Sequence, residues 1–244
     1  MKETIYTIPI NEAFDTDCEC PICHFLKKEE YNRVEYSLGA SMMEPDSRIL
    51  SNERGYCSRH TQMMYNYGNK LSHALVLETR LQYIENTVKN LRMSISKKKD
   101  KSFFRRRKTP ELHTNENFKL ISETSHSCAI CERLDKVMAG FVSNLFHMYK
   151  NDANFRDKFF SSKGFCLKHF ELLLTKSSDY LSNDSYIEFV DKICLLQEKQ
   201  VARVKDDVNW FTKKFDYRYK DEDWKNSKDA VQRGCLKISG FIDE

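Results

Sequence analysis

The sequence predicts a mainly α-helical protein made of two homologous modules with long packed helices, related as a pseudo-two-fold repeat. Three observations support this prediction. The 244 residues include only 7 Gly and 4 Pro, too few for the frequent turns of an all-β fold. Apolar residues recur at spacings of three and four, the period of an amphipathic helix. A pattern of cysteine, glycine and histidine residues occurs twice along the chain.

The composition limits the class of protein. With 40% hydrophobic and 31% charged residues, the chain fits a folded protein better than a disordered one. No apolar run approaches the ~20 residues that cross a bilayer, and residues 1–9 lack the apolar core of a signal peptide. We therefore expect a cytoplasmic protein. At ~100 to 200 residues per domain, the length allows one large domain or two small ones.

The duplicated pattern is a C-x-x-C pair followed by glycine, an aromatic residue and C-x-x-H. The first copy has Cys20-Pro21-Ile22-Cys23 and then Gly55-Tyr56-Cys57-Ser58-Arg59-His60. The second copy has Cys128-Ala129-Ile130-Cys131 and then Gly164-Phe165-Cys166-Leu167-Lys168-His169. The gaps between the second and third cysteines, 33 and 34 residues, are nearly equal. This agreement indicates an internal repeat.

Each copy predicts the same succession of helices. A helix follows each C-x-x-C pair, a further apolar start follows each C-x-x-H, and a long helix ends each copy. The first of these helices has an apolar face that is weak in copy one (Leu26, Tyr31, Val34, Leu38) and clear in copy two (Leu134, Val137, Met138, Phe141, Leu145, Met148). The long helices carry narrow stripes at Ala74, Leu77, Leu81, Ile84, Val88, Leu91 and Ile95, and at Val190, Cys194, Gln197, Val201, Val204, Val208, Phe211 and Phe215. Such a stripe is typical of a seam between helices, so we expect the two long helices to pack together.

The modules are expected at residues 14–96 and 120–216, joined by a basic linker at 97–119 and followed by a C-terminal brace helix within 217–244. The stretch from Lys97 to Lys108 holds eight basic residues and one acid; because the whole chain carries +4, the rest sums to −3. This balance argues against a basic nucleic-acid-binding body. We interpret the stretch as a solvated linker. The alternative is a nucleic-acid-binding arm made of Lys97, Lys98, Lys99, Arg105, Arg106, Arg107 and Lys108.

Eight residues of the repeat are predicted metal ligands. Two cysteines separated by two residues can place both sulfurs on one ion, and a C-x-x-H in the first turn of a helix places its two side chains on the same side. Pairing the halves within each copy gives one site from Cys20, Cys23, Cys57 and His60, and another from Cys128, Cys131, Cys166 and His169. Gly55 and Gly164 are expected to allow a tight turn that a side chain would obstruct.

The remaining cysteines are interpreted separately. Cys18 is either a substitute for Cys20 or a spare thiol near the metal. Cys194 and Cys235 are expected to be small apolar core residues.

The ligand set favours zinc over other metals. Three thiolates and one imidazole in a reducing compartment are typical of structural zinc, at two ions per chain. The alternative is an iron–sulfur cluster, which would make the protein an iron–sulfur or thiol-based redox or iron sensor. The segment ending in His24 also matches the C-x-x-C-H signature of haem attachment, but Glu132 replaces that histidine in the second copy. We therefore expect His24 to be a surface residue or to lie just outside the metal ligands.

The sequence favours a function without catalysis. A catalytic zinc keeps a coordination position open, whereas each predicted set has four protein ligands. The chain has no phosphate-binding loop, nucleophile elbow, dinucleotide fingerprint or H-E-x-x-H motif. We expect an intracellular metal-binding protein that presents a helical surface to a protein or nucleic-acid partner. Its oligomeric state is left open.

The repeat also resembles a known family. The motifs are the duplicated C-x-x-C and G-aromatic-C-x-x-H pattern, with Glu44-Pro45-Asp46-Ser47-Arg48 before the first G-Y-C-S-R-H and Asn154-Phe155-Arg156 before the second G-F-C-L-K-H. Together they are similar to an uncharacterised bacterial, Firmicutes-type family catalogued as a domain of unknown function. The resemblance covers almost the whole chain. It implies a bacterial cytosolic origin and tandem metal-binding modules, and it implies no activity or substrate.

Overall fold

The computed structural model describes residues 6–101 and 112–240, and these contain α-helices and short 3-10 helices but no strand. The prediction of a mainly α-helical protein is confirmed. The α-helices are α1 (Ile8–Asp15), α2 (Pro21–Leu38), α3 (Pro45–Arg54), α4 (Ser58–Asn66), α5 (Lys70–Lys101), α6 (Glu116–His126), α7 (Ala129–Asn151), α8 (Ala153–Ser161), α9 (Leu167–Tyr180), α10 (Asn183–Lys213) and α11 (Ala230–Ser239). Three 3-10 helices lie at Ala40–Met43, Leu112–Thr114 and Tyr217–Tyr219.

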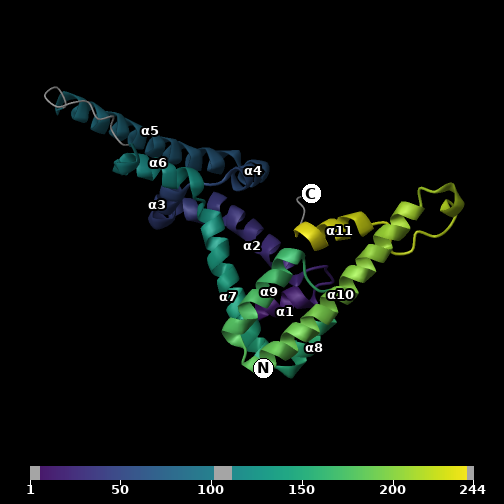
Figure 1. The fold of residues 1–244 in the computed structure, drawn as a ribbon. Helices are drawn as coiled ribbons and strands as arrows, with labels where there is room; N and C mark the ends of the chain where they lie inside the picture. Colours follow the sequence, from purple (N-terminus) through teal and green to yellow (C-terminus); the bar gives the residue numbers. More distant parts are fainter. Residues whose placement is uncertain (1–5, 102–111, 241–244) are drawn as a thin grey trace. The chain divides into compact units, whose positions relative to one another are not determined.

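The repeat in the sequence is also a repeat of helices (Figure 1). The series α1 to α5 has the same order as the series α6 to α10, with a short helix before each C-x-x-C pair and a long helix at the end. The segment expected as a linker, 97–119, begins as the last turns of α5 and ends within α6; residues 102–111 lie outside the described residues. Helix α11 follows the second series, and the described residues after the first series contain no counterpart of it.

The chain forms two compact units that do not follow the order of the sequence. The first unit contains Met1–Lys28 and Val137–Glu244, and the second contains Glu29–Lys136. Helices α2 and α7 each begin in one unit and end in the other. Each compact unit therefore combines segments from both copies of the repeat. The module boundaries 14–96 and 120–216 stay a prediction about the order along the chain.

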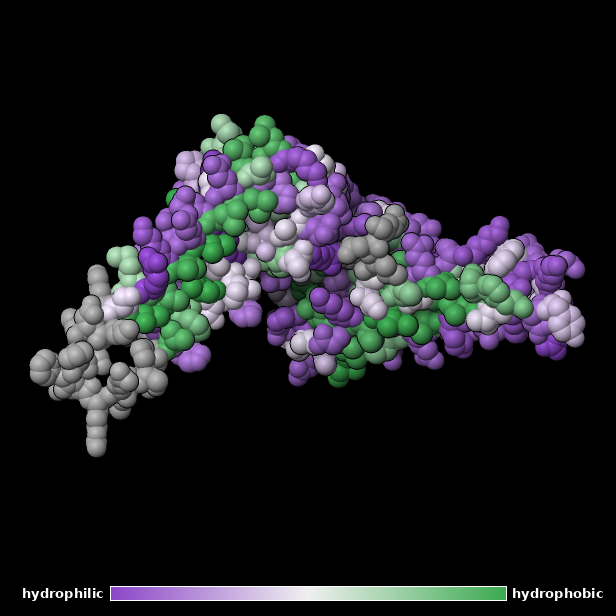
Figure 2. Space-filling view, turned by 90° about the horizontal axis from the view of Figure 1, so that it is seen from above, coloured by the Kyte–Doolittle hydropathy of each residue, from purple (hydrophilic) through white to green (hydrophobic). Residues whose placement is uncertain are grey.

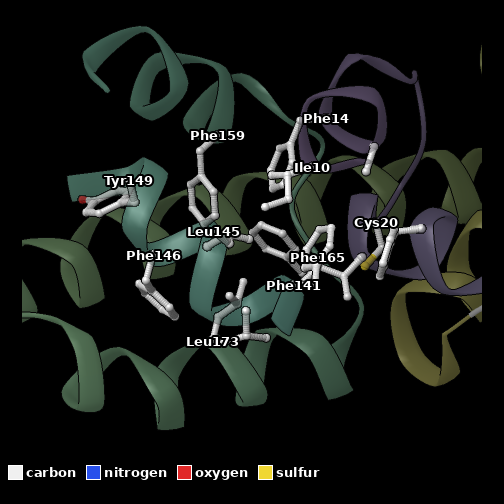
Figure 3. Close-up of a cluster of buried hydrophobic side chains, with 14 of the residues drawn as sticks. Ile10, Phe14, Cys20, Phe141, Leu145, Phe146, Tyr149, Phe159, Phe165 and Leu173 are labelled. Carbon is white, nitrogen blue, oxygen red and sulfur yellow. The ribbon is translucent and has the colours of Figure 1, made fainter. Parts of the chain in front are cut away.

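The first unit has a core rich in phenylalanine. Phe146, Phe159, Phe165 and Phe189 are completely buried there. Figure 3 shows Phe159 and Phe165 among the side chains that meet in this core. Phe25, at the start of α2, stacks on Phe141 of α7 with ring centroids 4.3 Å apart. Burial of this many large rings supplies the main hydrophobic stabilisation of the unit.

The second unit has a smaller core. Its buried members are Val34, Leu38, Met64, Cys128 and Ile130. They come from the end of α2, from α4 and from the start of α7. The start of α2 therefore contacts the middle of α7 in the first unit, through Phe25 and Phe141. The end of α2 packs with residues at the start of α7 in the second unit.

The long helices pack against shorter helices of their own units. Helix α5 contacts α3, α4 and α6, and α10 contacts α8, α9 and α11. Packing of α5 against α10, expected from their apolar stripes, is not a feature of either unit. The stripe of α5 is instead largely exposed, with Leu77 41%, Leu81 62% and Val88 50% accessible. In Figure 2 hydrophobic residues form a band along α5 and α6.

None of the described helices combines the length and the hydropathy that a bilayer span requires.

Candidate metal centres

The structure gathers the eight predicted ligand residues into two clusters. Cluster A consists of Cys20, Cys23, Cys166 and His169, and it lies within the first unit. Cluster B consists of Cys57, His60, Cys128 and Cys131, and it lies within the second unit. In each cluster the four ligand atoms all lie within 4.8 Å of one another. Each cluster thus has the three sulfurs and one imidazole expected from the motifs.

The expected pairing within each sequence copy is wrong. The C-x-x-C pair of each copy meets the C-x-x-H pair of the other copy. The reason is the lengths of the helices between the two halves. Helix α2 has 18 residues and carries the chain about 27 Å away from Cys20, at 1.5 Å per residue, whereas the 10 residues of α3 span only about 15 Å. The chain is therefore directed to the end of α2, where the start of α7 supplies the other cysteine pair.

The histidine of each cluster directs one ring nitrogen at all three sulfurs. In cluster A, Nδ1 of His169 lies 3.5 Å from Sγ of Cys20, 3.3 Å from that of Cys23 and 3.2 Å from that of Cys166. In cluster B, Nδ1 of His60 lies 3.2 Å from Sγ of Cys57, 3.2 Å from that of Cys128 and 3.4 Å from that of Cys131. The two clusters therefore have the same internal geometry.

Two helix N-termini meet at each cluster. Cys57 and Cys166 are the N-cap residues of α4 and α9, and the histidines lie in the first turns of these helices. Cys20 and Cys128 stand directly before α2 and α7. The positive end of a helix dipole stabilises a thiolate, so both clusters favour the ionised sulfurs that a metal requires.

The two motif glycines have the backbone conformation that the sequence predicts. Gly55 has φ +63° and Gly164 has φ +77°, in the left-handed region where a side chain is strained. A Cβ atom at Gly164 would also lie 2.9 Å from Oε1 of Gln197. That Gln197 side chain accepts a hydrogen bond from the backbone N–H of Phe165 and donates one to its carbonyl, which fixes the turn before Cys166.

Cluster B has a carboxylate behind its histidine. Nε2 of His60 donates a hydrogen bond to Oε1 of the buried Glu30 at 2.9 Å, and Arg59 donates to the other oxygen at 2.8 Å. A carboxylate in this position fixes the ring orientation and strengthens a histidine ligand. A shift of 108 residues aligns Cys20 with Cys128 and Glu30 with Met138, so the second copy has an apolar side chain at this position.

No spacing rule in the sequence identifies Glu30. Counted along α2, Glu30 lies two helical turns from Cys23, which suggests the cluster of Cys23, but its actual contact is in cluster B.

Cluster A has an ionic network and a covering helix instead. Glu19, directly before Cys20, is buried and receives hydrogen bonds from Arg203 at 2.6 and 2.8 Å. Nζ of Lys237, on α11, lies 3.1 Å from the Glu19 carboxylate and donates to its backbone carbonyl at 2.7 Å. At the end of α11, a Cβ atom on Gly240 would lie 3.7 Å from Sγ of Cys23. The C-terminus of α11 therefore packs against cluster A.

The thiols and imidazole of cluster B interact electrostatically. Burial raises the pKa of Cys128, but the hydrogen bond with His60, the backbone N–H groups of Cys131 and Cys57 and the charge of His60 together lower that pKa to about 6. Burial lowers the pKa of His60, but hydrogen bonds with Cys128 and Glu30 raise it to about 10. In cluster A, hydrogen bonds from Cys20 and Cys23 hold the pKa of Cys166 well below its ordinary value. Each cluster therefore already holds one sulfur as a thiolate near neutral pH.

The remaining candidate residues lie outside the clusters. Cys18 is a partly buried free thiol and does not replace Cys20. Cys194 and Cys235 are exposed, so their expected place in the core is wrong. His24 is exposed, with Nε2 3.5 Å from the Thr16 hydroxyl oxygen. Of the basic stretch, the side chains of Lys97, Lys98 and Lys99 and the whole of Arg105, Arg106, Arg107 and Lys108 lie outside the described residues.

A comparison with known protein families identifies the family of this chain. The model of a family described as "Family of unknown function (DUF6062)" matches residues 1–244. The chain belongs to this family. No curated protein and no solved structure matches it. For this DUF6062 protein, the chemistry of the two clusters is therefore the starting point for a functional argument.

Proposed function

We propose that each cluster binds one zinc ion and that the protein is a non-enzymatic metal-binding protein with two structural Cys3His zinc sites. The observation that carries the proposal is the convergence of three sulfurs and one ring nitrogen in each cluster, all within 4.8 Å of one another. A tetrahedral zinc ion sets its sulfur ligands about 3.8 Å apart and its nitrogen about 3.6 Å from each sulfur. The sulfur pairs Cys23–Cys166 and Cys57–Cys131 lie 3.5 and 3.9 Å apart.

The same distances favour a single ion over an iron–sulfur cluster. Such a cluster distributes its protein ligands over several iron atoms, so its thiolates must stand farther apart than ligands of one ion. The ring nitrogens lie 3.2 to 3.5 Å from the sulfurs in both clusters. Zinc matches this compact set of borderline-soft ligands.

A structural role agrees with the surroundings of the clusters. All four members of cluster A are buried, and helix α11 packs beside two of its sulfurs. A catalytic zinc needs a coordination position for water and a route for substrate, and four protein ligands supply neither. We infer that the ions join the two copies of the repeat rather than carry out a reaction. Thiolate ligation without disulfides fits the reducing cytoplasm, where we place this function.

We further propose that the helical surface of the protein binds a protein partner. The exposed apolar stripe on α5 includes Leu77, Leu81, Ile84 and Val88. A largely apolar pocket of about 240 Å³ between α5 and α6 includes Ile84 and Val88 in its lining. Contiguous exposed apolar residues are typical of interaction surfaces. Changing Leu81 and Val88 to Ser should abolish binding to such a partner and leave the zinc content unchanged.

The nucleic-acid alternative has its own test. If the basic stretch binds phosphates, retention on DNA or RNA will fall steeply with salt and disappear when Arg105, Arg106 and Arg107 are changed to Ala. Retention that persists after this triple change would show that the basic stretch does not bind the nucleic acid.

Metal analysis of freshly purified protein tests the central proposal. We expect a colourless protein with two zinc ions per chain, and cobalt substitution should give the visible absorption of tetrahedral thiolate coordination. A brown, oxygen-sensitive sample that contains iron and sulfide would instead establish the redox sensor.

Chelation tests the structural role. Structural zinc supplies ~10 kcal/mol or more of folding free energy, so metal removal should reduce the helical circular dichroism signal. Full helicity and unchanged thermal stability in metal-free protein would contradict this role.

A further inference from the structure

The two copies of the repeat can be compared position by position in space. A shift of 108 residues aligns α2 with α7 and the start of α3 with the start of α8. Hydrogen bonds follow the same shift: Arg48 donates to the carbonyl of Met42 at 3.4 Å, and Arg156 donates to the carbonyl of Lys150 at 3.1 Å. Both arginines and both acceptors are equivalent positions. The alignment therefore holds for the structure as well as for the sequence.

At these aligned positions the first unit has a closed aromatic core. Phe25 stacks on Phe141, and both are buried. Leu145, Phe159 and Phe165 are completely buried beside them. Figure 3 shows Phe141, Leu145 and Phe165 close together in this core.

The second unit has polar residues at the same positions. Arg133 and Arg33 take the places of the stacked Phe25 and Phe141. Ser37 takes the place of Leu145, Ser47 that of Phe155 and Ser51 that of Phe159. Tyr56 takes the place of Phe165 at a shift of 109, because the second copy has one more residue before its C-x-x-H pair. These six residues line a pocket of about 260 Å³. At these aligned positions the first unit is therefore filled with apolar side chains, and the second unit has a pocket.

The lining of the pocket has the chemistry of an anion site. It includes two arginines and four serines and no acidic residue. Nε of Arg33 is buried and has no hydrogen-bond partner among the described residues, although a terminal nitrogen of this side chain contacts Glu29 at 3.3 Å. Arg133 forms no ion pair with a described residue. Buried N–H groups are rarely left without an acceptor, and the planar guanidinium matches the oxygens of carboxylate and phosphate groups.

The pocket also has an apolar side. Leu50 and Ile130 belong to its lining, as does the aromatic ring of Tyr56. Pockets for organic ligands combine such apolar surface with a few polar groups that fix orientation. The volume of about 260 Å³ suits a compact molecule with one charged end.

We propose that this pocket of the second unit binds a small organic oxyanion, a carboxylate or phosphate whose oxygens contact Arg33 and Arg133 and whose apolar part contacts Leu50 and Ile130. The site stands beside cluster B, because Tyr56 precedes Cys57 and Ile130 lies between Cys128 and Cys131. Ligand binding is nonetheless a separate property from metal binding. It is measured on the zinc-loaded protein, with the zinc content determined in parallel.

Calorimetric titration of the zinc-loaded full chain with phenyl phosphate, benzoate and inorganic phosphate tests the proposal. We expect saturable 1:1 binding of phenyl phosphate or benzoate, and the stronger of the two identifies the anion class. Inorganic phosphate should bind more weakly than phenyl phosphate, because it lacks the apolar part. Absence of saturable binding by all three probes would overturn the proposal, and so would equal binding of phenyl phosphate and inorganic phosphate.

A double substitution that rebuilds the first unit's core gives the sharper test. Changing Arg33→Phe and Arg133→Phe should weaken binding of the better probe at least about tenfold, the effect of losing one charged hydrogen bond or more. The control, Lys89→Ala with Arg92→Ala, removes two exposed positive charges outside the pocket and should leave binding unchanged. Unaltered binding in the Phe variant, or an equal loss of binding in the control, would contradict the proposal that the anion binds in this pocket.

A second variant tests the proposal even if the Phe variant does not fold. Arg33→Gln with Arg133→Gln keeps polar side chains of intermediate length and removes both charges. It should retain helicity and two zinc ions per chain while losing binding by the same factor. Retained binding in this variant would exclude a role for the two guanidinium groups.

Discussion

The sulfur atoms of Cys23 and Cys166 lie 3.5 Å apart although 143 residues separate them along the chain. An ion bound between them would join the beginning of one sequence copy to the middle of the other. Cluster B makes the reciprocal connection between Cys57 and Cys131. The two proposed zinc ions therefore act as crosslinks that each close a long loop, and the loss of either one should affect both copies of the repeat.

The crossed pairing gives a direct prediction for zinc stoichiometry. The double variant Cys23→Ser/Cys166→Ser should lose one zinc ion, because both residues belong to cluster A. The double variant Cys23→Ser/Cys57→Ser should lose both ions, because its residues belong to different clusters. Pairing within each sequence copy predicts the opposite result for these two variants. Elemental analysis of the purified proteins distinguishes the two arrangements.

The buried carboxylate of Glu30 predicts a difference between the two metal sites. Glu30→Gln should weaken zinc binding at cluster B about 10- to 100-fold, because the hydrogen bond to Nε2 of His60 orients and strengthens this ligand. Cluster A should keep its affinity, since its histidine has Met138 at the aligned position. Competition with a chromophoric chelator should therefore resolve one weakened and one unchanged site. Glu53→Gln, which changes an exposed carboxylate, is the control. If it weakens zinc binding as much as Glu30→Gln does, the proposed role of Glu30 is contradicted.

The glycine before Cys166 predicts a loss of stability on substitution. Gly164→Ala places a Cβ at φ +77°, a strain of about 1 to 2 kcal/mol, and adds a close contact with Gln197. The thermal midpoint should fall by several degrees. Gly140→Ala is the matched control in the same unit: it lies within α7, has no atom within 4 Å of the added Cβ, and should stabilise by about 0.5 to 1 kcal/mol. If the Gly164→Ala variant is as stable as the Gly140→Ala variant, a side chain causes no backbone strain at position 164 and the prediction is wrong.

Much of the fold and of the candidate site can be predicted from the sequence. Particular residues show which features cannot. The helices follow from apolar periodicity, and the ligand types and the turn at Gly164 follow from the motifs, because these are local properties. The partner of Cys23 is not local: it depends on how far α2 carries the chain and which helix lies at its end. The exposure of Leu81 could not be predicted for the same reason. An apolar stripe indicates that a helix has a packing face, but it does not identify the element that covers this face. The pocket at Arg33 is likewise not local, because its lining combines side chains of α2, α3 and α7 that are distant in the sequence.

Acidification should destabilise the second unit through His73. This side chain is buried on α5, and burial, together with the nearby charge of Lys70, lowers its pKa below the ordinary 6.5. Between the lowered folded pKa and about 6.5, the unfolded chain binds a proton that the folded chain does not. Stability therefore falls as the pH decreases through this window and stops falling below the folded pKa.

The variant His73→Gln isolates this contribution, because it removes the titrating group and retains a polar side chain. The difference in unfolding free energy between the variant and the natural protein should shift in favour of the variant as the pH falls below about 6.5. Zinc release on acidification affects both proteins, so zinc content is measured at each pH and only points with both ions bound are compared. An NMR titration that places the pKa of His73 at or above 6.5 would show that burial does not disfavour the charged ring, and the predicted pH dependence would then be absent.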